Sequence, residues 1–154
     1  MRQIKVRGKS LITRNWVYGT YIEGYIISGF LDATSEYITI ERWEPVDPET
    51  VGQFTGIKDK NGVEIYEGDP IIASWGIKYN KEYKPVSIYK GVVKFGEYEQ
   101  DGSGGEYGGA KVIGFYGDFH SGADSDEKFA ELSSWAYEKE QSLLKFDEIE
   151  VVGG

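Results

Sequence analysis

The sequence predicts a mostly β protein that is built from short antiparallel strands. Its 154 residues include 21 glycines, 12 tyrosines and 4 tryptophans, a composition that is typical of short strands joined by tight turns. Apolar runs of a few residues alternate with Gly, Asn, Asp and Ser, which is the pattern of strands and hairpins. Apolar residues with helical spacing occur in one segment only, so we expect at most one short helix.

The first 45 residues contain several strand patterns that are rich in Tyr, Ile, Val and Trp. Glycine, aspartate and serine separate them, as turn residues do. We expect these strands to form an N-terminal sheet, followed by a connection over residues 45–50. The strands are predicted at residues 3–6, 15–21, 25–31 and 36–43.

The segment 50–69 reads TVGQFTGIKDKNGVEIYEGD and predicts two turns around a short strand. Gly56 can bend the first extended run, because glycine takes a positive φ at little cost. Asn61-Gly62 predicts a hairpin turn, since both residues tolerate left-handed backbone. Residues 63–66 alternate as a half-buried strand does, and 67–69 form the second turn.

Further strands are expected at residues 71–75, 86–95 and 111–116. Gly91 marks a β-bulge or a kink in the longest of them. The polar residues 80–85 predict a loop.

The helix candidate covers residues 124–145, with Asp124 or Ser125 as its N-cap. Phe129, Leu132 and Trp135 follow at helical spacing. The pair Ser133-Ser134 weakens the helix pattern, and a strand over 135–137 is the alternative. Val151-Val152 predicts a short closing strand.

Three parts of the chain resemble the YopX-like family, whose members are small proteins of Gram-positive phages and prophages. The central segment 50–69 carries the specific signature, and MRQIKVRG at 1–8 with WVYG at 16–19 is similar to the family's opening. EVVG at 150–153 is similar to its closing strand. Pro70 departs from the family pattern, and because proline offers no N–H we expect an edge or a bend there. Relatives usually continue with a short polar tail after the closing strand, and this sequence has no segment that matches that tail.

The resemblance implies a single YopX-like domain over 1–154 without a firmly assigned biochemical activity. Within it, residues 1–45 would form the N-terminal sheet. Residues 46–154 resemble a small SH3-like barrel, into which Tyr66-Glu67-Gly68-Asp69 leads.

Charge and composition narrow the function classes. Residues 1–96 carry 13 Lys and Arg against 12 Asp and Glu, whereas residues 97–154 carry 4 against 14. Such a dipolar chain suits head-to-tail docking or a basic partner, although solubility alone also explains the charge. The lack of cysteine and of a long apolar run predicts a cytoplasmic protein of the host cell without disulfides.

Two groups of residues could bind ligands, and each has a simpler interpretation. The carboxylates and imidazole of Asp118, His120, Asp124 and Asp126 could hold a divalent ion, but their spacing also fits an acidic surface loop. The glycine-rich residues 102–105 (GSGG) and 108–109 (GG) invite a phosphate-loop interpretation. No Gly-Lys-Ser/Thr follows them, so a flexible hairpin loop is favoured.

Surface-binding interpretations rest on aromatic and basic residues. Aromatic platforms would bind sugars or bases, although cross-strand packing explains the same spacing. Nucleic-acid binding would need one basic face. The aromatic sets are Tyr18, Tyr21 and Tyr25, or Tyr79, Tyr83 and Tyr89, and the basic set is Arg2, Lys5, Arg7, Lys90 and Lys94.

Four polar residues of the signature could bind a partner: Gln53, Thr55, Asp59 and Asp69. Turn chemistry explains the two aspartates equally well, because Asp side chains accept bonds from nearby backbone N–H groups.

We therefore expect a non-enzymatic phage or prophage accessory protein, with no catalytic, cofactor-binding or metal-binding residues. It would act through protein contacts and form a homo-oligomer through its N-terminal strands, because exposed strand edges need a cover. An unidentified host or phage protein is a further partner. The alternatives are an acidic inhibitor that imitates nucleic acid and a carboxylate-based hydrolase.

Overall fold

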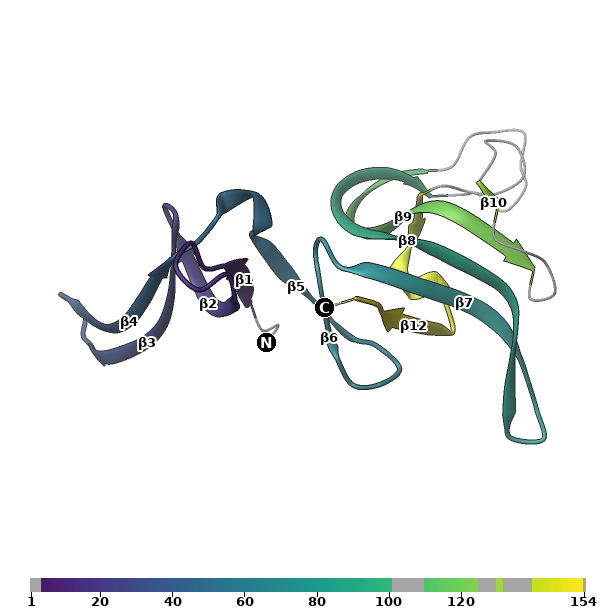
Figure 1. Ribbon diagram of the computed structural model, residues 1–154, viewed down its shortest axis with the longest axis horizontal. Helices are drawn as coiled ribbons and strands as arrows, with labels where there is room; N and C mark the ends of the chain where they lie inside the picture. Colours follow the sequence, from purple (N-terminus) through teal and green to yellow (C-terminus); the bar gives the residue numbers. More distant parts are fainter. Residues whose placement is uncertain (1–3, 101–109, 125–129, 132–139, 154) are drawn as a thin grey trace. The chain divides into compact units, whose positions relative to one another are not determined.

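The computed structural model describes residues 4–100, 110–124, 130–131 and 140–153. The chain divides into two compact units, Met1–Ile57 and Lys58–Gly154. Figure 1 shows the strands of the two units. The N-terminal unit ends later than residue 45, because a strand beyond that residue pairs with its first strand. The single-domain assignment remains a prediction.

The N-terminal unit contains an antiparallel sheet in the order β4-β3-β2-β1-β5. The four strands predicted before residue 45 are present, with the first displaced toward the C-terminus. A 3₁₀ turn, η1, precedes β5 and is capped by Asp47, whose carboxylate accepts the N–H of Glu49 at 3.1 Å. The bounds are β1 Val6–Lys9, β2 Trp16–Ile22, β3 Tyr25–Ala33, β4 Ile38–Pro45, η1 Pro48–Thr50 and β5 Gly52–Lys58.

The core of this unit is small and lies against β1. Ile26 and Val46 are almost fully buried. A Cβ added at Gly8 would lie 3.1 Å from Val46 Cβ and 3.2 Å from Ile26 Cδ1. The missing side chain at Gly8 thus lets the two apolar residues close over β1.

The second unit contains a sheet in the order β10-β9-β8-β7-β12, and β11 pairs with residues 116–118 in the middle of β9. β12 lies alongside β7 (Figure 1). Phe119, Tyr89 and Phe146 form its aromatic core, with ring centroids 5.2–5.8 Å apart. The bounds are β6 Glu64–Tyr66, β7 Pro70–Tyr79, β8 Glu82–Gln100, β9 Ala110–Asp124, β10 Ala130–Glu131, β11 Glu140–Ser142, η2 Leu143–Lys145 and β12 Glu148–Val151.

The predicted loop over 80–85 is wrong. β7 and β8 continue to a two-residue turn, in which Tyr79 pairs with Glu82. Asn80 and Lys81 both take positive φ, 51° and 66°, as the central residues of a type I′ hairpin turn do. Without a glycine at either position, the turn carries a weak sequence signal.

The bulge predicted at Gly91 is confirmed. The pairing of β8 with β9 shifts between Lys90 and Gly91, which leaves His120 as the extra residue on β9. A Cβ on Gly91 would lie only 2.3 Å from the backbone oxygen of Asp118. Glycine is required here because the two backbones approach closely.

The predicted helix is wrong wherever the structure describes it. Residues 130–131 and 140–142 pair with β9 as strands, and 143–145 form a 3₁₀ turn. Pairing with a neighbouring strand overrides the local helical spacing. Phe129, Leu132, Trp135 and the alternative strand at 135–137 lie outside the described residues.

Pro70 is the first residue of β7, directly after the turn at 67–69. β7 lies between β8 and β12, so it is not an edge strand. The first position of a strand tolerates proline, and its carbonyl still accepts the Val152 N–H at 2.9 Å.

The mostly β fold class and the N-terminal sheet are confirmed, and the described residues contain only 3₁₀ turns as helical structure. The SH3-like barrel remains a prediction. Within the described part of the chain, no helix has the length and apolar character needed to cross a bilayer.

Candidate functional site

Asp59 organises the hairpin of the central segment. Its Oδ1 accepts the N–H groups of Asn61 at 2.8 Å and Val63 at 2.9 Å. The Gly62 N–H donates to the Asp59 carbonyl at 3.0 Å, and Gly62 has the positive φ, 82°, that the sequence predicts. The turn interpretation of Asp59 is thus confirmed.

The same carboxylate also reaches the far end of the chain. Asp59 Oδ2 accepts the N–H of Val151 at 3.0 Å, and the Lys60 N–H donates to the Ile149 carbonyl at 2.9 Å. Lys60 Nζ lies 3.1 Å from Glu150 Oε2, whose hydrogen bond raises the Lys60 pKa. The hairpin therefore holds β12 in place, a role that no local pattern indicates.

The pKa of Asp59 is lowered from its usual value. Burial of the carboxylate opposes ionisation, but the N–H groups of Val151, Val63 and Asn61 together with Lys60 outweigh it. Hydrogen bonds to the charged form favour that form. The carboxylate is consequently ionised and fully engaged by the protein's own backbone.

Asp69 has a similar local role in the second turn. Its Oδ2 accepts the Tyr66 N–H at 2.8 Å, and its own N–H donates to the Tyr66 carbonyl at 3.1 Å. Thr55 Oγ1 accepts the Ile57 N–H at 3.3 Å, and Gln53 lies opposite Val6 in the ladder between β1 and β5. The polar side chains of the signature thus mainly accept hydrogen bonds from backbone N–H groups of their own turns.

Asp118, His120 and Asp124 lie on β9, so the predicted surface loop is wrong for these three residues. Asp118 Oδ2 forms an ion pair with Lys94 Nζ across β8 and β9, and this pair raises the Lys94 pKa. His120 is exposed at the bulge. Asp124 ends β9, and Asp126 lies outside the described residues. Among the described residues, no group of three or more His, Cys, Asp or Glu side chains is arranged to hold a metal ion.

The proposed basic residues are divided between the two units. Arg7 is buried with its guanidinium carbon 4.0 Å from the Trp16 ring centroid. Lys5 lies 5.6 Å from the Phe54 ring centroid. Lys90 and Lys94 belong to the second unit. Arg2 lies outside the described residues, as do the glycine-rich residues 102–105 and 108–109.

The aromatic sets are divided between core and surface. Tyr89 is buried, whereas Tyr83 exchanges a hydrogen bond with Ser74 at 3.0 Å and Tyr79 is exposed. Of the N-terminal set, Tyr18 and Tyr25 are about half exposed. Only Tyr25 contributes to a larger surface feature, which the sequence did not reveal.

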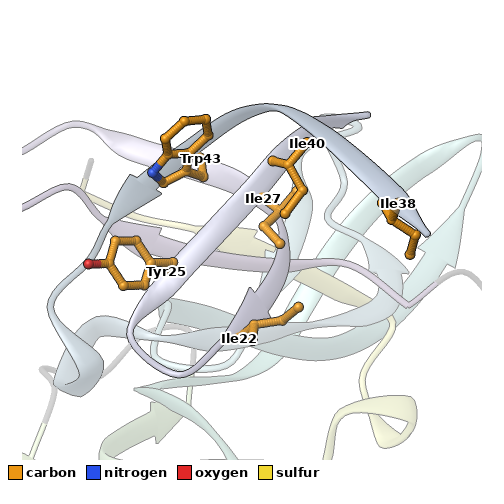
Figure 2. A pocket seen from close by; sticks show the side chains of 6 residues that line it. All are labelled: Ile22, Tyr25, Ile27, Ile38, Ile40 and Trp43. Carbon is orange, nitrogen blue, oxygen red and sulfur yellow. The ribbon is translucent and has the colours of Figure 1, made fainter. Parts of the chain in front are cut away.

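That feature is an open apolar hollow of about 490 Å³ on β2, β3 and β4 (Figure 2). Trp43 and Ile38 are each 59% exposed and Ile22 is 52% exposed, whereas Ile27 forms the buried floor. Soluble monomers rarely expose a large contiguous apolar surface without a function. The alternation at Ile38-Thr39-Ile40 is the one local signal of this surface. We call it the apolar face: Ile22, Tyr25, Ile27, Ile38, Ile40 and Trp43.

The apolar face reaches the edge of its sheet. β4 is the last strand in the order of the N-terminal unit. Glu41 and Arg42 are exposed near its middle, where the pairing with β3 is irregular. This region thus combines exposed apolar side chains, an open strand edge and two opposite charges.

The family model described as YopX protein matches residues 5–119. The chain belongs to the YopX family. The crystal structure of protein EF1440 from Enterococcus faecalis is similar to this YopX-family chain, with 21% sequence identity and a TM-score of 0.45. The match covers 100% of this chain and 94% of that chain. No curated protein matches the sequence.

Proposed function

We propose that this YopX-family chain is a non-enzymatic accessory protein of a phage or prophage that works through protein–protein contacts in the host cytoplasm. It forms a homo-oligomer through its N-terminal strands. The observation that carries the proposal is the apolar face, because exposed apolar side chains around an open hollow gain free energy when a partner removes them from water.

The polar residues support a structural rather than a catalytic role. Asp59 and Asp69 are occupied by backbone N–H groups, and Asp118 forms an ion pair with Lys94. A general acid or base needs access to a substrate. Because these carboxylates are already held by groups of the protein, their contacts favour a protein that binds a partner over one that catalyses a reaction.

Sedimentation equilibrium of the full chain, over a range of concentrations, tests the homo-oligomer. We expect a mass above that of the monomer for the natural sequence. Ile40→Lys should shift the mass toward the monomer, because it places a charge within the apolar face. The matched control is Ile113→Lys, an exposed strand isoleucine of the second unit, which should leave the mass unchanged.

The circular dichroism spectra of both variants should match that of the natural protein, since both side chains are exposed. A monomer at every concentration would reject the proposal. An oligomer that tolerates Ile40→Lys as well as Ile113→Lys would reject the apolar face as its interface.

A further inference from the structure

We propose that a second copy of this chain pairs with β4 in antiparallel orientation, so that Glu41 of each copy lies opposite Arg42 of the other. The inference rests on the proposed homo-oligomer and specifies its geometry. The two sheets then join across a two-fold axis, as in other isologous interfaces.

The free part of the β4 edge sets the length of the contact. Leu11 N–H donates to the Pro45 carbonyl at 2.9 Å, and Val46 forms a bridge with Ser10. The following loop therefore occupies the C-terminal end of β4. Among the described residues, no backbone bond is made to the outer side of 38–44, so this stretch is the part open to a partner.

The two charges lie on the opposite face of the strand from the apolar face. A Cβ added at Gly29, which pairs with Arg42, would lie 3.1 Å from Arg42 Nε and 3.5 Å from Glu41 Oε2. Ile40 and Trp43 instead line the hollow with Ile27 (Figure 2). The bulge in β4 allows this arrangement, because two consecutive residues there share one face.

Charge and side-chain face together select one register. With Glu41 opposite the partner's Arg42, Ile40 lies opposite the partner's Trp43, and both pairs occur twice. A shift by one residue in either direction places Glu41 opposite Glu41 or Arg42 opposite Arg42, and like charges directly opposite each other are destabilising. The same shift sets Ile40 against a polar residue.

Charges and bulges often protect an exposed edge from pairing. Charges protect a strand edge from pairing with a second copy only if the pairing would bring like charges together. Here the adjacent charges have opposite signs, so an antiparallel copy meets its complement. The pairing also covers the outer side of Ile40 and Trp43, since cross-strand neighbours lie in contact.

Charge reversal in the full chain tests the register, with the dimer dissociation constant measured by sedimentation velocity. Glu41→Arg and Arg42→Glu should each weaken the dimer by about tenfold or more, because each turns two attractive pairs into repulsive ones. The double variant with both substitutions should regain the natural dissociation constant. Glu49→Arg makes the same charge change on η1 and should have no effect.

Cysteine cross-linking provides an independent measurement, because the natural chain has no cysteine. The register sets Thr39 opposite the partner's Glu44, at a separation suited to a disulfide. The double variant Thr39→Cys with Glu44→Cys should form oxidised dimers. Either cysteine alone should not, because it would lie roughly 17 Å from its own copy.

A wild-type monomer would overturn both this register and the proposed function. A dimer that loses affinity with Ile40→Lys, but is indifferent to both charge reversals and gives no paired cross-link, would overturn the register alone. In that case the two apolar faces pack face to face.

Discussion

Asp59 Oδ2 accepts the backbone N–H of Val151 across 3.0 Å and 92 sequence positions. The residue that shapes a local hairpin thereby fixes the last strand of the second unit. β12 itself contains four residues and pairs only with β7 within the described sheet. So short a strand depends on additional contacts, and the hairpin supplies them.

Asp59→Asn should destabilise the protein by about 1–3 kcal/mol, because a buried donor is left unsatisfied. The amide oxygen of the asparagine can still accept the N–H groups of Asn61 and Val63. Its NH₂ group would then face the Val151 N–H, and two donors cannot form a hydrogen bond with each other. Urea unfolding followed by tryptophan fluorescence measures the loss. Glu99→Gln is the control, since Glu99 is exposed on β8, and it should change the free energy of unfolding little.

Acid should remove the contribution of Asp59. Its folded pKa is lowered below the ordinary value of an aspartate, so the unfolded chain binds more protons in this range and stability rises with pH. The contribution is complete above the unfolded pKa of about 3.9 and is lost as pH falls through the folded pKa. The stability difference between the natural protein and Asp59→Asn should therefore shrink from about pH 5 to pH 2. A difference that is constant across this range would contradict the ionised carboxylate.

Gly62→Val should cost more than about 1 kcal/mol. Gly62 has φ 82° and an added Cβ would meet no atom within 4 Å, so backbone strain is the whole effect. Gly114→Val is a matched control, because Gly114 also has open space but lacks a positive φ. Thermal unfolding of both variants should separate strain from side-chain size. Equal effects would show that the turn conformation is not the cause.

His120→Ala should leave the melting temperature unchanged, with or without calcium, magnesium, manganese or zinc. His120 is exposed at the bulge opposite Gly91, and Asp118 is engaged by Lys94 at 2.6 Å. A ligand that binds only the folded state must raise the melting temperature. A saturable rise with one of these metals that vanishes in His120→Ala would establish a metal site.

Raising the salt concentration should weaken self-association only modestly. Exposed charges are screened over about 8 Å at physiological ionic strength, which affects Glu41 and Arg42. Contacts of Ile40 and Trp43 are apolar and persist. Sedimentation equilibrium at low and high salt measures the balance. Complete dissociation at high salt would instead indicate assembly steered by the uneven charge of the chain, and a monomer in all conditions would favour the acidic nucleic-acid mimic.

The sequence predicted those parts of the fold that depend on neighbouring residues. Asn61-Gly62 and the bulge at Gly91 are recognisable because only a few residue types adopt such backbone. The turn at Asn80-Lys81 was missed, since a lysine with positive φ is uncommon. The strands in the expected helix depend on β9 as a partner, which is nonlocal information.

The candidate interface was predicted only in outline. Exposed N-terminal strands suggested self-association, but the apolar face requires Ile40 and Trp43, three positions apart on β4, to share one side. That depends on the irregular register between β3 and β4. A shift of one residue would move a side chain to the other side of the sheet, so no count along the sequence could establish the face.

The pairing of β12 with β7 has a consequence for the order of events during synthesis on the ribosome. The pairings from β4 through β1 to β5 join residues no later than Lys58. β7 must wait for residues 148–151 before its second neighbour exists. The nascent chain thus carries β7 with one side uncovered until residues 148–151 emerge, and an uncovered edge is the part of a growing protein most exposed to misassembly.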